Sequence, residues 1–130
     1  MTKPGNYVRT FLNPGGVIEQ HFVGAQNPQE ILDAIKKLAV YSKRQRKTNQ
    51  PVLILVDVSK ITKMDLSQRT LGIRKASIKA MRAIDYESAA VCGSLSVQVM
   101  VSTLALVAGV QRKVKVFDDR IDALRWLRAK

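Results

Sequence analysis

Polar and charged side chains follow an apolar run near the middle of the chain. Residues 52–58 are apolar except for Asp57, and hydroxyls and lysines come next, namely Ser59, Lys60, Thr62 and Lys63. A carboxylate, hydroxyls and lysines together could receive an anion or contact a partner. The hydroxyls could instead be phosphorylated, because a phosphate adds close to two negative charges to its site. The candidates for such a modification are Ser59, Thr62 and Ser67.

The surrounding elements bring these residues to one edge of a sheet. The run 52–58 is typical of a strand buried on both faces, as in a parallel sheet. Residues 88–92 predict a second strand, after which a helix begins whose free N–H groups attract anions. Ligands of open α/β sheets bind at the carboxyl ends of the strands. We therefore expect a site for an anionic ligand or a partner formed by Asp57, Ser59, Lys60, Thr62, Lys63, Gly93 and Ser94.

A purely structural role for the hydroxyls is the alternative interpretation. Serine side chains commonly satisfy backbone groups in loops and at the start of helices. Under that interpretation Ser59, Ser67 and Ser94 are loop or capping residues and mark no ligand site.

The pattern of the whole chain predicts an α/β fold with the order β-β-α-β-α-β-α-β-α. Two strand-like runs at 6–12 and 17–23 flank a turn sequence, Asn-Pro-Gly-Gly, which predicts an N-terminal β-hairpin. Strands then alternate with four helices, which indicates a mostly parallel mixed sheet with helices packed against it. The 130 residues predict a single domain, 1–130.

Local signals predict where the first and last helices begin. Asn27 and Glu30 have the spacing of a capping box, with Pro28 at the first helical position. Asp118 and Asp119 are expected to open the last helix as cap and first-turn acids. The apolar seam expected for that helix is formed by Ile121, Leu124 and Leu127.

The net charge of +12 is unusual and unevenly distributed. Thirteen Lys or Arg residues lie between positions 36 and 82, against only Asp57 and Asp65. Such a field concentrates acidic partners, which we take to be an acidic protein, an anionic lipid or nucleic acid, although it could also serve solubility alone. The N-terminal residues are not those of a signal peptide, and the longest weakly polar run is too short to span a bilayer. We expect a cytoplasmic protein without a transmembrane segment.

The helix expected at 67–82 has two contrasting faces. Its buried stripe is predicted to consist of Leu66, Thr70, Ile73, Ser77, Ala80 and Ile84. The opposite face carries Lys75, Lys79 and Arg82, with Leu71 and Ile78 beside them. Lysines mixed with exposed apolar side chains would make a docking face for a membrane or a partner. The alternative is a solvated face with Leu71 and Ile78 tucked under neighbouring side chains.

The sequence contains little that indicates catalysis. His21 is the only histidine and Cys92 the only cysteine, so most metal sites and an internal disulfide are excluded. Cys92 ends a strand in an apolar run and is expected to be an inert buried thiol. No phosphate-binding glycine loop is present. We expect no enzyme activity, no metal and no cofactor. The helix expected after Ser94 is apolar around most of its circumference, so it should be buried on more than one side. The second side could form a dimer interface, a groove for acyl chains or a contact with the next helix, and we favour the homodimer.

Two segments resemble a known family. Residues 114–117 form a strand ending in Phe117, Asp118 follows, and residues 123–127 read Ala-Leu-Arg-Trp-Leu. This ending resembles that of the SpoIIAA-like (STAS/SEC14) branch of STAS domains, and residues 53–59 resemble the third STAS strand and its following loop. The resemblance implies a STAS-like fold over the whole chain.

The better-known members of that family are bacterial anti-sigma factor antagonists controlled by phosphorylation of a serine in an Asp-Ser-Ser-Gly-Leu motif. This chain has Thr62-Lys-Met-Asp65 there, so the resemblance does not carry the switch over. We expect a non-enzymatic regulatory domain of a bacterial cytoplasm that binds a protein or an anionic or lipidic ligand. The alternative is a basic nucleic-acid-binding protein that uses residues 36–82. Two observations disfavour it: only 5% of the residues are aromatic, and no helix-turn-helix signature is present.

Overall fold

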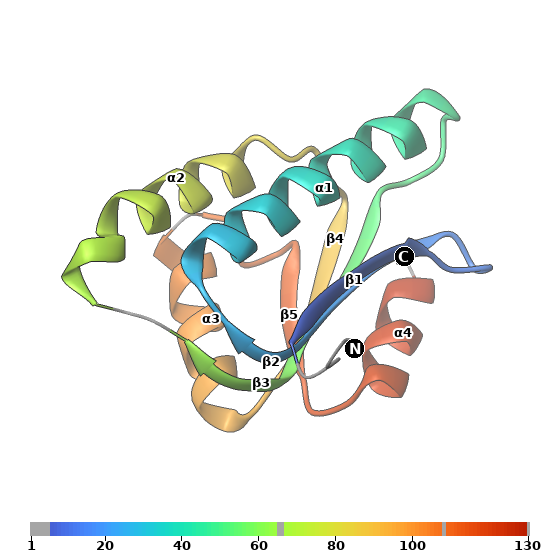
Figure 1. Ribbon diagram of the computed structural model, residues 1–130. Helices are drawn as coiled ribbons and strands as arrows, with labels where there is room; N and C mark the ends of the chain where they lie inside the picture. Colours follow the sequence, from blue (N-terminus) through green and yellow to red (C-terminus); the bar gives the residue numbers. More distant parts are fainter. Residues whose placement is uncertain (1–5, 65–66, 108, 130) are drawn as a thin grey trace, which may run out of the picture.

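The computed structural model describes residues 6–64, 67–107 and 109–129, and shows a sheet with helices on both faces (Figure 1). The strands are β1 (Tyr7–Leu12), β2 (Val17–Gln26), β3 (Leu53–Met64), β4 (Ser88–Cys92) and β5 (Val114–Phe117). The helices are α1 (Pro28–Lys47), the 3₁₀ turn η1 (Gln68–Thr70), α2 (Leu71–Arg82), α3 (Leu95–Val107) and α4 (Arg120–Arg128). In this part of the chain no helix has the length and apolar composition needed to cross a bilayer.

The five strands lie in the sheet in the order of the sequence, β1-β2-β3-β4-β5. β1 is antiparallel to β2, and the other neighbouring pairs are parallel. Asn13 closes the hairpin, because its side-chain oxygen accepts hydrogen bonds from the N–H groups of Gly15 and Val17. Gly16 adopts a φ of +85°, which favours glycine at this turn. The predicted mixed sheet with an N-terminal hairpin and four helices is confirmed.

Alternation along the strands separates two apolar layers. Ile18, Val52 and Ile54 face the side covered by α1, whose Leu38 packs among them. Val17, Leu53, Leu55 and Ala90 face the other side, where Ala123, Leu124 and Leu127 of α4 cover them. Helices α1 and α2 lie side by side on the first face, while α4 is alone against the second (Figure 1). Because α4 packs mainly against β3, β4 and β5, most of the β1–β2 part of its face is left without a covering helix in the described chain.

Helix α3 contacts β4 and β5 and carries an exposed apolar side. Ala105 is buried, but Leu95, Val99 and Leu106 are exposed. Gly109 follows the helix with a φ of +75°, and its N–H donates to the Leu106 carbonyl, as expected for a glycine at a helix end.

β3 is longer than the sequence indicated. The strand does not end at residue 58 as expected, because β2 extends to Gln26 and pairs with the continuation of β3 as far as Met64. The register shifts twice, since β3 has one extra residue between Asp57 and Lys60 and another between Ile61 and Lys63. These are β-bulges, in which one strand has an unpaired residue opposite its partner.

The predicted start of α1 is confirmed, and that of α4 is confirmed in part. The Asn27–Glu30 capping box forms with both reciprocal hydrogen bonds. Asp119 caps α4 by accepting from the Asp122 N–H, but Asp118 lies before the helix and accepts from Gln98. Asp118 is therefore not the cap, and the first-turn acid is Asp122 rather than Asp119.

Two apolar assignments need correction, because burial depends on which helices cover a side chain. Ile121 is exposed, since α4 turns Ala123 rather than Ile121 toward the sheet. Leu71 and Ile78 of α2 are also exposed, so the tucked alternative for them is wrong. The expected stripe of α2 is found in part: Thr70 and Ser77 are buried, and Ile73, Ala80 and Ile84 are half-buried. Leu66 lies outside the described residues.

Gly93, between β4 and α3, allows a close approach that a side chain would prevent. A Cβ atom there would lie 2.8 Å from Val97 Cγ1 and 3.2 Å from Val58 Cγ2. We expect Gly93→Ala to lower the free energy of unfolding by about 1–3 kcal/mol, because α3 must move away from β3. Urea denaturation measures the change.

Gly72→Ala in α2 is the matched control, since a Cβ there meets no described atom within 4 Å. It should leave stability unchanged or raise it by up to about 1 kcal/mol, because alanine favours a helix. Equal losses in the two variants would contradict the close-approach explanation.

Candidate functional site

One row of residues crosses all five strands on the face that α4 partly covers. In register, Arg9 lies opposite His21, His21 opposite Asp57, Asp57 opposite Cys92, and Cys92 opposite Phe117. Directly paired residues of a sheet point to the same face. The row therefore runs from charged side chains on the uncovered part of the sheet to apolar ones beneath α4.

Glu19, two residues before His21 on the same face, is fully buried and fully bonded. The Nε and one terminal N–H group of Arg120 donate to its two oxygens, each at 2.7 Å. Asn13 Nδ2 donates to Oε2 at 2.8 Å, and His21 Nε2 lies 2.8 Å from Oε1. The carboxylate thus joins the hairpin turn, β2 and the first residue of α4.

These contacts keep Glu19 ionised despite its burial. Burial alone would raise the pKa of the carboxyl, but hydrogen bonds from Arg120, Asn13 and His21 and the charge of Arg120 outweigh it and lower the pKa to about 2. Arg120 is fixed in the same way, and the Glu19 carboxylate raises its pKa. The pair presents a positioned guanidinium at the edge of the uncovered sheet.

His21 lies between two carboxylates. Besides its contact with Glu19, its Nδ1 is 3.5 Å from Asp57 Oδ2. The Phe11 ring stacks on the imidazole with 5.8 Å between centroids and 6° between planes. The Arg9 guanidinium lies over the Phe11 ring, 4.6 Å from the centre of that ring. Arg9, Phe11 and His21 therefore form one layered wall.

The first bulge of β3 brings Lys60 to the same face as Asp57. In a regular strand, residues three apart point to opposite faces. The extra residue makes Lys60 pair with Val23, which lies on the face of His21. The Ser59 N–H and hydroxyl both donate to Asp57 Oδ1, at 2.9 and 2.6 Å, so Asp57 satisfies a backbone group at the bulge.

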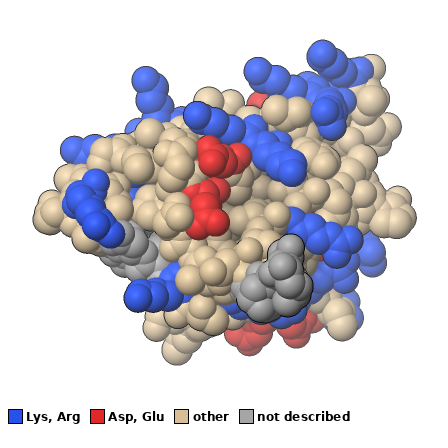
Figure 2. Space-filling view, in the orientation of Figure 1, with Lys and Arg blue, Asp and Glu red and all other residues tan. Residues whose placement is uncertain are grey.

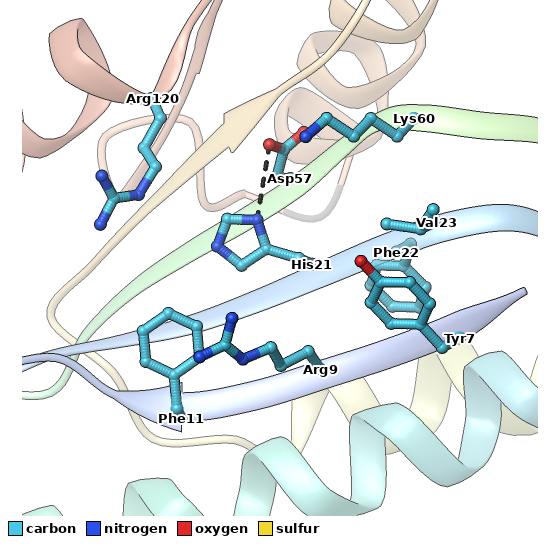
Figure 3. A pocket seen from close by; sticks show the side chains of 9 residues that line it. All are labelled: Tyr7, Arg9, Phe11, His21, Phe22, Val23, Asp57, Lys60 and Arg120. Carbon is cyan, nitrogen blue, oxygen red and sulfur yellow. Dashed lines mark ion pairs between the residues drawn. The ribbon is translucent and has the colours of Figure 1, made fainter. Parts of the chain in front are cut away.

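Together these side chains line a cavity of about 290 Å³ on the uncovered face. Its lining consists of Tyr7, Arg9, Phe11, His21, Phe22, Val23, Asp57, Lys60 and Arg120. Figure 3 shows Arg9, Lys60 and Arg120 around His21, with the rings of Tyr7 and Phe22 at the other end. Within the described part of the chain, neither Arg9 nor Lys60 forms an ion pair with an acidic side chain.

The structure brings together some of the residues expected at the site. Asp57 and Lys60 line the cavity, and Ser59 holds Asp57. Thr62 and Lys63 are exposed further along β3 and do not line the cavity; the second bulge pairs Lys63 with Ala25. The third candidate for phosphorylation, Ser67, is exposed just before η1.

Gly93 and Ser94 lie beyond the row, at the start of α3. The Ser94 hydroxyl accepts from the Val97 N–H at 3.4 Å, and the Gly93 carbonyl accepts from Gln98 Nε2 at 3.0 Å. The structural interpretation is therefore confirmed for Ser94 as a helix cap. It does not describe Ser59, whose hydroxyl bonds to Asp57.

Most of the cavity lining was not found from the sequence. The sequence alone assigns no role to Tyr7, Arg9, Phe11 or Glu19. Glu19 and His21 do alternate along β2, which places both on one face and is the only local signal available. Arg120 is 101 residues from Glu19, so no spacing rule connects them.

Cys92 does not add a nucleophile to the site. Its side chain is buried beneath α4, and burial, together with the charge of Asp57, raises the pKa of the thiol to about 12. His21 is two strands away, roughly 10 Å. No group of three or more His, Cys, Asp or Glu within the described ranges could hold a metal ion.

Comparison of the fold with solved structures identifies similar architectures. An uncharacterised protein of the DUF3478 family from Shewanella loihica, described as having a SpoIIAA-like fold, aligns with a TM-score of 0.62 and 16% identity over 98% of both chains. The anti-sigma factor antagonist SpoIIAA in its unphosphorylated form aligns with a TM-score of 0.56 and 9% identity, over 95% of this chain and 100% of that one. No family model and no curated protein matches the sequence.

The chain has a SpoIIAA-like fold. The resemblance noted in residues 53–59 and 114–127 is confirmed at the level of architecture. At these identities the alignments define the fold alone, so the function must be argued from the site.

Glu19 should make stability depend on pH in acid. A group whose pKa is lowered on folding stabilises the protein above its ordinary pKa of 4.5, and this contribution is lost as the pH falls toward about 2. We expect Glu19→Gln to lower the free energy of unfolding by about 2–3 kcal/mol at pH 7, because Arg120 loses its buried partner. The difference from wild type should shrink between pH 4.5 and 2.

Urea denaturation at several pH values measures this difference, with Glu87→Gln as control. Glu87 also pairs with an arginine, Arg46, but the pair is exposed and screened by water. The control should lose much less stability at pH 7. A Glu19→Gln deficit that stayed constant down to pH 2 would contradict the ionised state assigned to Glu19.

Proposed function

We propose that the protein is a non-enzymatic binding domain that holds a small organic anion in the cavity between β1, β2, β3 and Arg120. A carboxylate attached to an apolar or aromatic group is the ligand class that fits best. The observation that carries the proposal is the pair of cations, Arg9 and Lys60, which face the cavity without acidic partners in the described chain.

Charge supports an anion. Three cations, Arg9, Lys60 and Arg120, act against two carboxylates, Asp57 in the lining and Glu19 beneath it. Counted without His21, these five groups have a net charge of plus one. A monoanion would neutralise it, and guanidinium groups bind carboxylates by paired hydrogen bonds. Glu19 occupies two donors of Arg120, so Arg9 has the freer guanidinium.

Shape and apolar surface support an attached carbon group. The rings of Tyr7 and Phe11 and the side chain of Val23 line the cavity beside the cations, and Phe22 borders it from β2. Ligand sites typically combine apolar walls with a few polar groups, and their volumes begin at about 300 Å³. A cavity of about 290 Å³ therefore fits a small ligand rather than a complete lipid.

Binding rather than reaction is the role that these groups support. The two carboxylates are already engaged, Glu19 by Arg120, Asn13 and His21, and Asp57 by Ser59. The thiol of Cys92 is buried outside the lining. A pocket whose acids are held in place by its own side chains suits recognition better than proton transfer.

Titration by NMR of the ¹⁵N-labelled protein tests this proposal. Benzoate, hexanoate and phenyl phosphate serve as probes, and benzamide is the neutral analogue of benzoate. We expect at least one anion to shift the amide signals of β1, β2 and β3 around Arg9, His21 and Lys60, with benzamide much weaker. Similar binding of benzamide, shifts mapped to another surface, or no shift at millimolar concentrations with any anion would overturn the proposal.

Substitution of the unpaired cations should weaken the binding found in that titration. Arg9→Gln and Lys60→Gln should each raise the dissociation constant at least about tenfold, because each removes a charge-assisted contact. Lys63→Gln is the matched control, since Lys63 lies on the same strand but outside the cavity. An equal loss in the control would mean that overall charge, not the cavity, attracts the probe.

A further inference from the structure

The outward side of α2 combines basic and apolar side chains that no neighbouring element covers. Thr70 and Ser77 are buried on the inner side, where α2 packs against α1. The outward side, which we call the α2 outer face, consists of Leu71, Lys75, Ile78, Lys79 and Arg82, all of them exposed. Leu71 is 39% exposed and Ile78 41%, so about two fifths of each apolar side chain is open to water.

Helix geometry places the two kinds of side chain in adjacent lines. Each residue turns by about 100° around the helix axis, so residues seven apart lie nearly in line. Leu71 and Ile78 form one such line, and Lys75 and Arg82 form the next, with Lys79 beside it. Met81, 45% exposed, extends the apolar side. The α2 outer face is thus amphipathic along its own length.

All the charged side chains in residues 67–82 are positive. Residues 67–82 contain five Lys or Arg and no Asp or Glu. Among the described residues, Lys75, Lys79 and Arg82 form no ion pair. In Figure 2, basic side chains project from the left part of the molecule, where Figure 1 places α2, while an acidic group lies nearer the centre.

We propose that the α2 outer face docks the protein onto an anionic membrane surface. Lys75, Lys79 and Arg82 attract the lipid phosphates, and Leu71 and Ile78 enter the boundary between headgroups and acyl chains. A helix lying in the membrane plane binds in this way, by charge and by shallow apolar burial together. The inference is independent of the cavity, because the cavity opens on the face covered by α4 and α2 lies on the other.

The apolar line favours a membrane over a nucleic acid. Phosphates of a nucleic acid are neutralised by lysine and arginine alone, and the aromatic side chains on which bases stack are absent from the α2 outer face. Exposed Leu71 and Ile78 add nothing to such a contact. An apolar phase beside the charges, as in a membrane, would bury both side chains.

Flotation with lipid vesicles tests the proposal on the full chain. Phosphatidylcholine vesicles with and without phosphatidylglycerol are used at low and high salt. We expect binding to the anionic vesicles only, weakened by salt because the attraction is screened. Lys75→Glu/Lys79→Glu should lower the partition coefficient at least about tenfold, because it replaces two attracting charges with repelling ones. Leu71→Ser/Ile78→Ser should lower it by a similar factor, because less apolar surface enters the membrane.

Two matched variants serve as controls. Lys36→Glu/Lys37→Glu makes the same charge change on α1, and Leu95→Ser/Val99→Ser removes exposed apolar side chains from α3. Both should keep nearly all vesicle binding, and circular dichroism confirms that every variant is folded. Absence of binding to anionic vesicles, or an equal loss in a control, overturns the proposal.

A single-stranded RNA measured by fluorescence anisotropy at the same salt completes the test. Weaker binding to RNA than to vesicles supports the membrane assignment. Tighter binding to RNA, unaffected by Leu71→Ser/Ile78→Ser, overturns it and assigns the basic segment to nucleic acid.

Discussion

A fully buried carboxylate, Glu19, is the constraint on which the arrangement of this protein depends. An ionised group without water is tolerated only when other groups satisfy it. Here Arg120 donates to both oxygens, and Asn13 and His21 complete the set. Arg120 is the first residue of α4 and Asn13 forms the hairpin turn, so one carboxylate fixes the start of the last helix against the first two strands. Helix α4 is held over β3–β5, and the sheet face over β1 and β2 stays open.

The open face becomes a cavity because of irregular strand pairing. A regular β3 would turn Asp57 and Lys60 to opposite faces. The bulge between them places both on the face of His21, and the Asp57 carboxylate accepts the N–H and hydroxyl of Ser59 at the same point. The stability of the bulge and the geometry of the site are therefore linked. The hydrogen bonds from Ser59 that stabilise the bulge also orient the Asp57 carboxylate, and the bulge turns Lys60 toward the cavity.

The two surfaces singled out for binding lie on different faces of the sheet. The cavity is formed by β1, β2, β3 and the first residue of α4, whereas α2 packs beside α1 on the other face. Their chemistry differs as well. The cavity has cations positioned by internal contacts and suits a small ligand, while the α2 outer face has flexible lysines beside exposed apolar side chains and suits an extended surface. A protein docked through α2 would keep the cavity open to solvent.

The order of elements, the hairpin turn, the capping box and most buried stripes follow from the sequence alone, because each depends on residues within a few positions of one another. The cavity does not. Glu19 has the sequence context of a solvent-facing strand residue, and its partner Arg120 lies 101 positions away. Lys60 joins Asp57 only through a bulge, which is set by how far β2 extends beside β3. Likewise, the exposure of Leu71 and Ile78 depends on which helix packs where. Local periodicity determines which segments form helices and strands. Only the tertiary packing determines which charged side chains come into contact and which apolar side chains stay exposed.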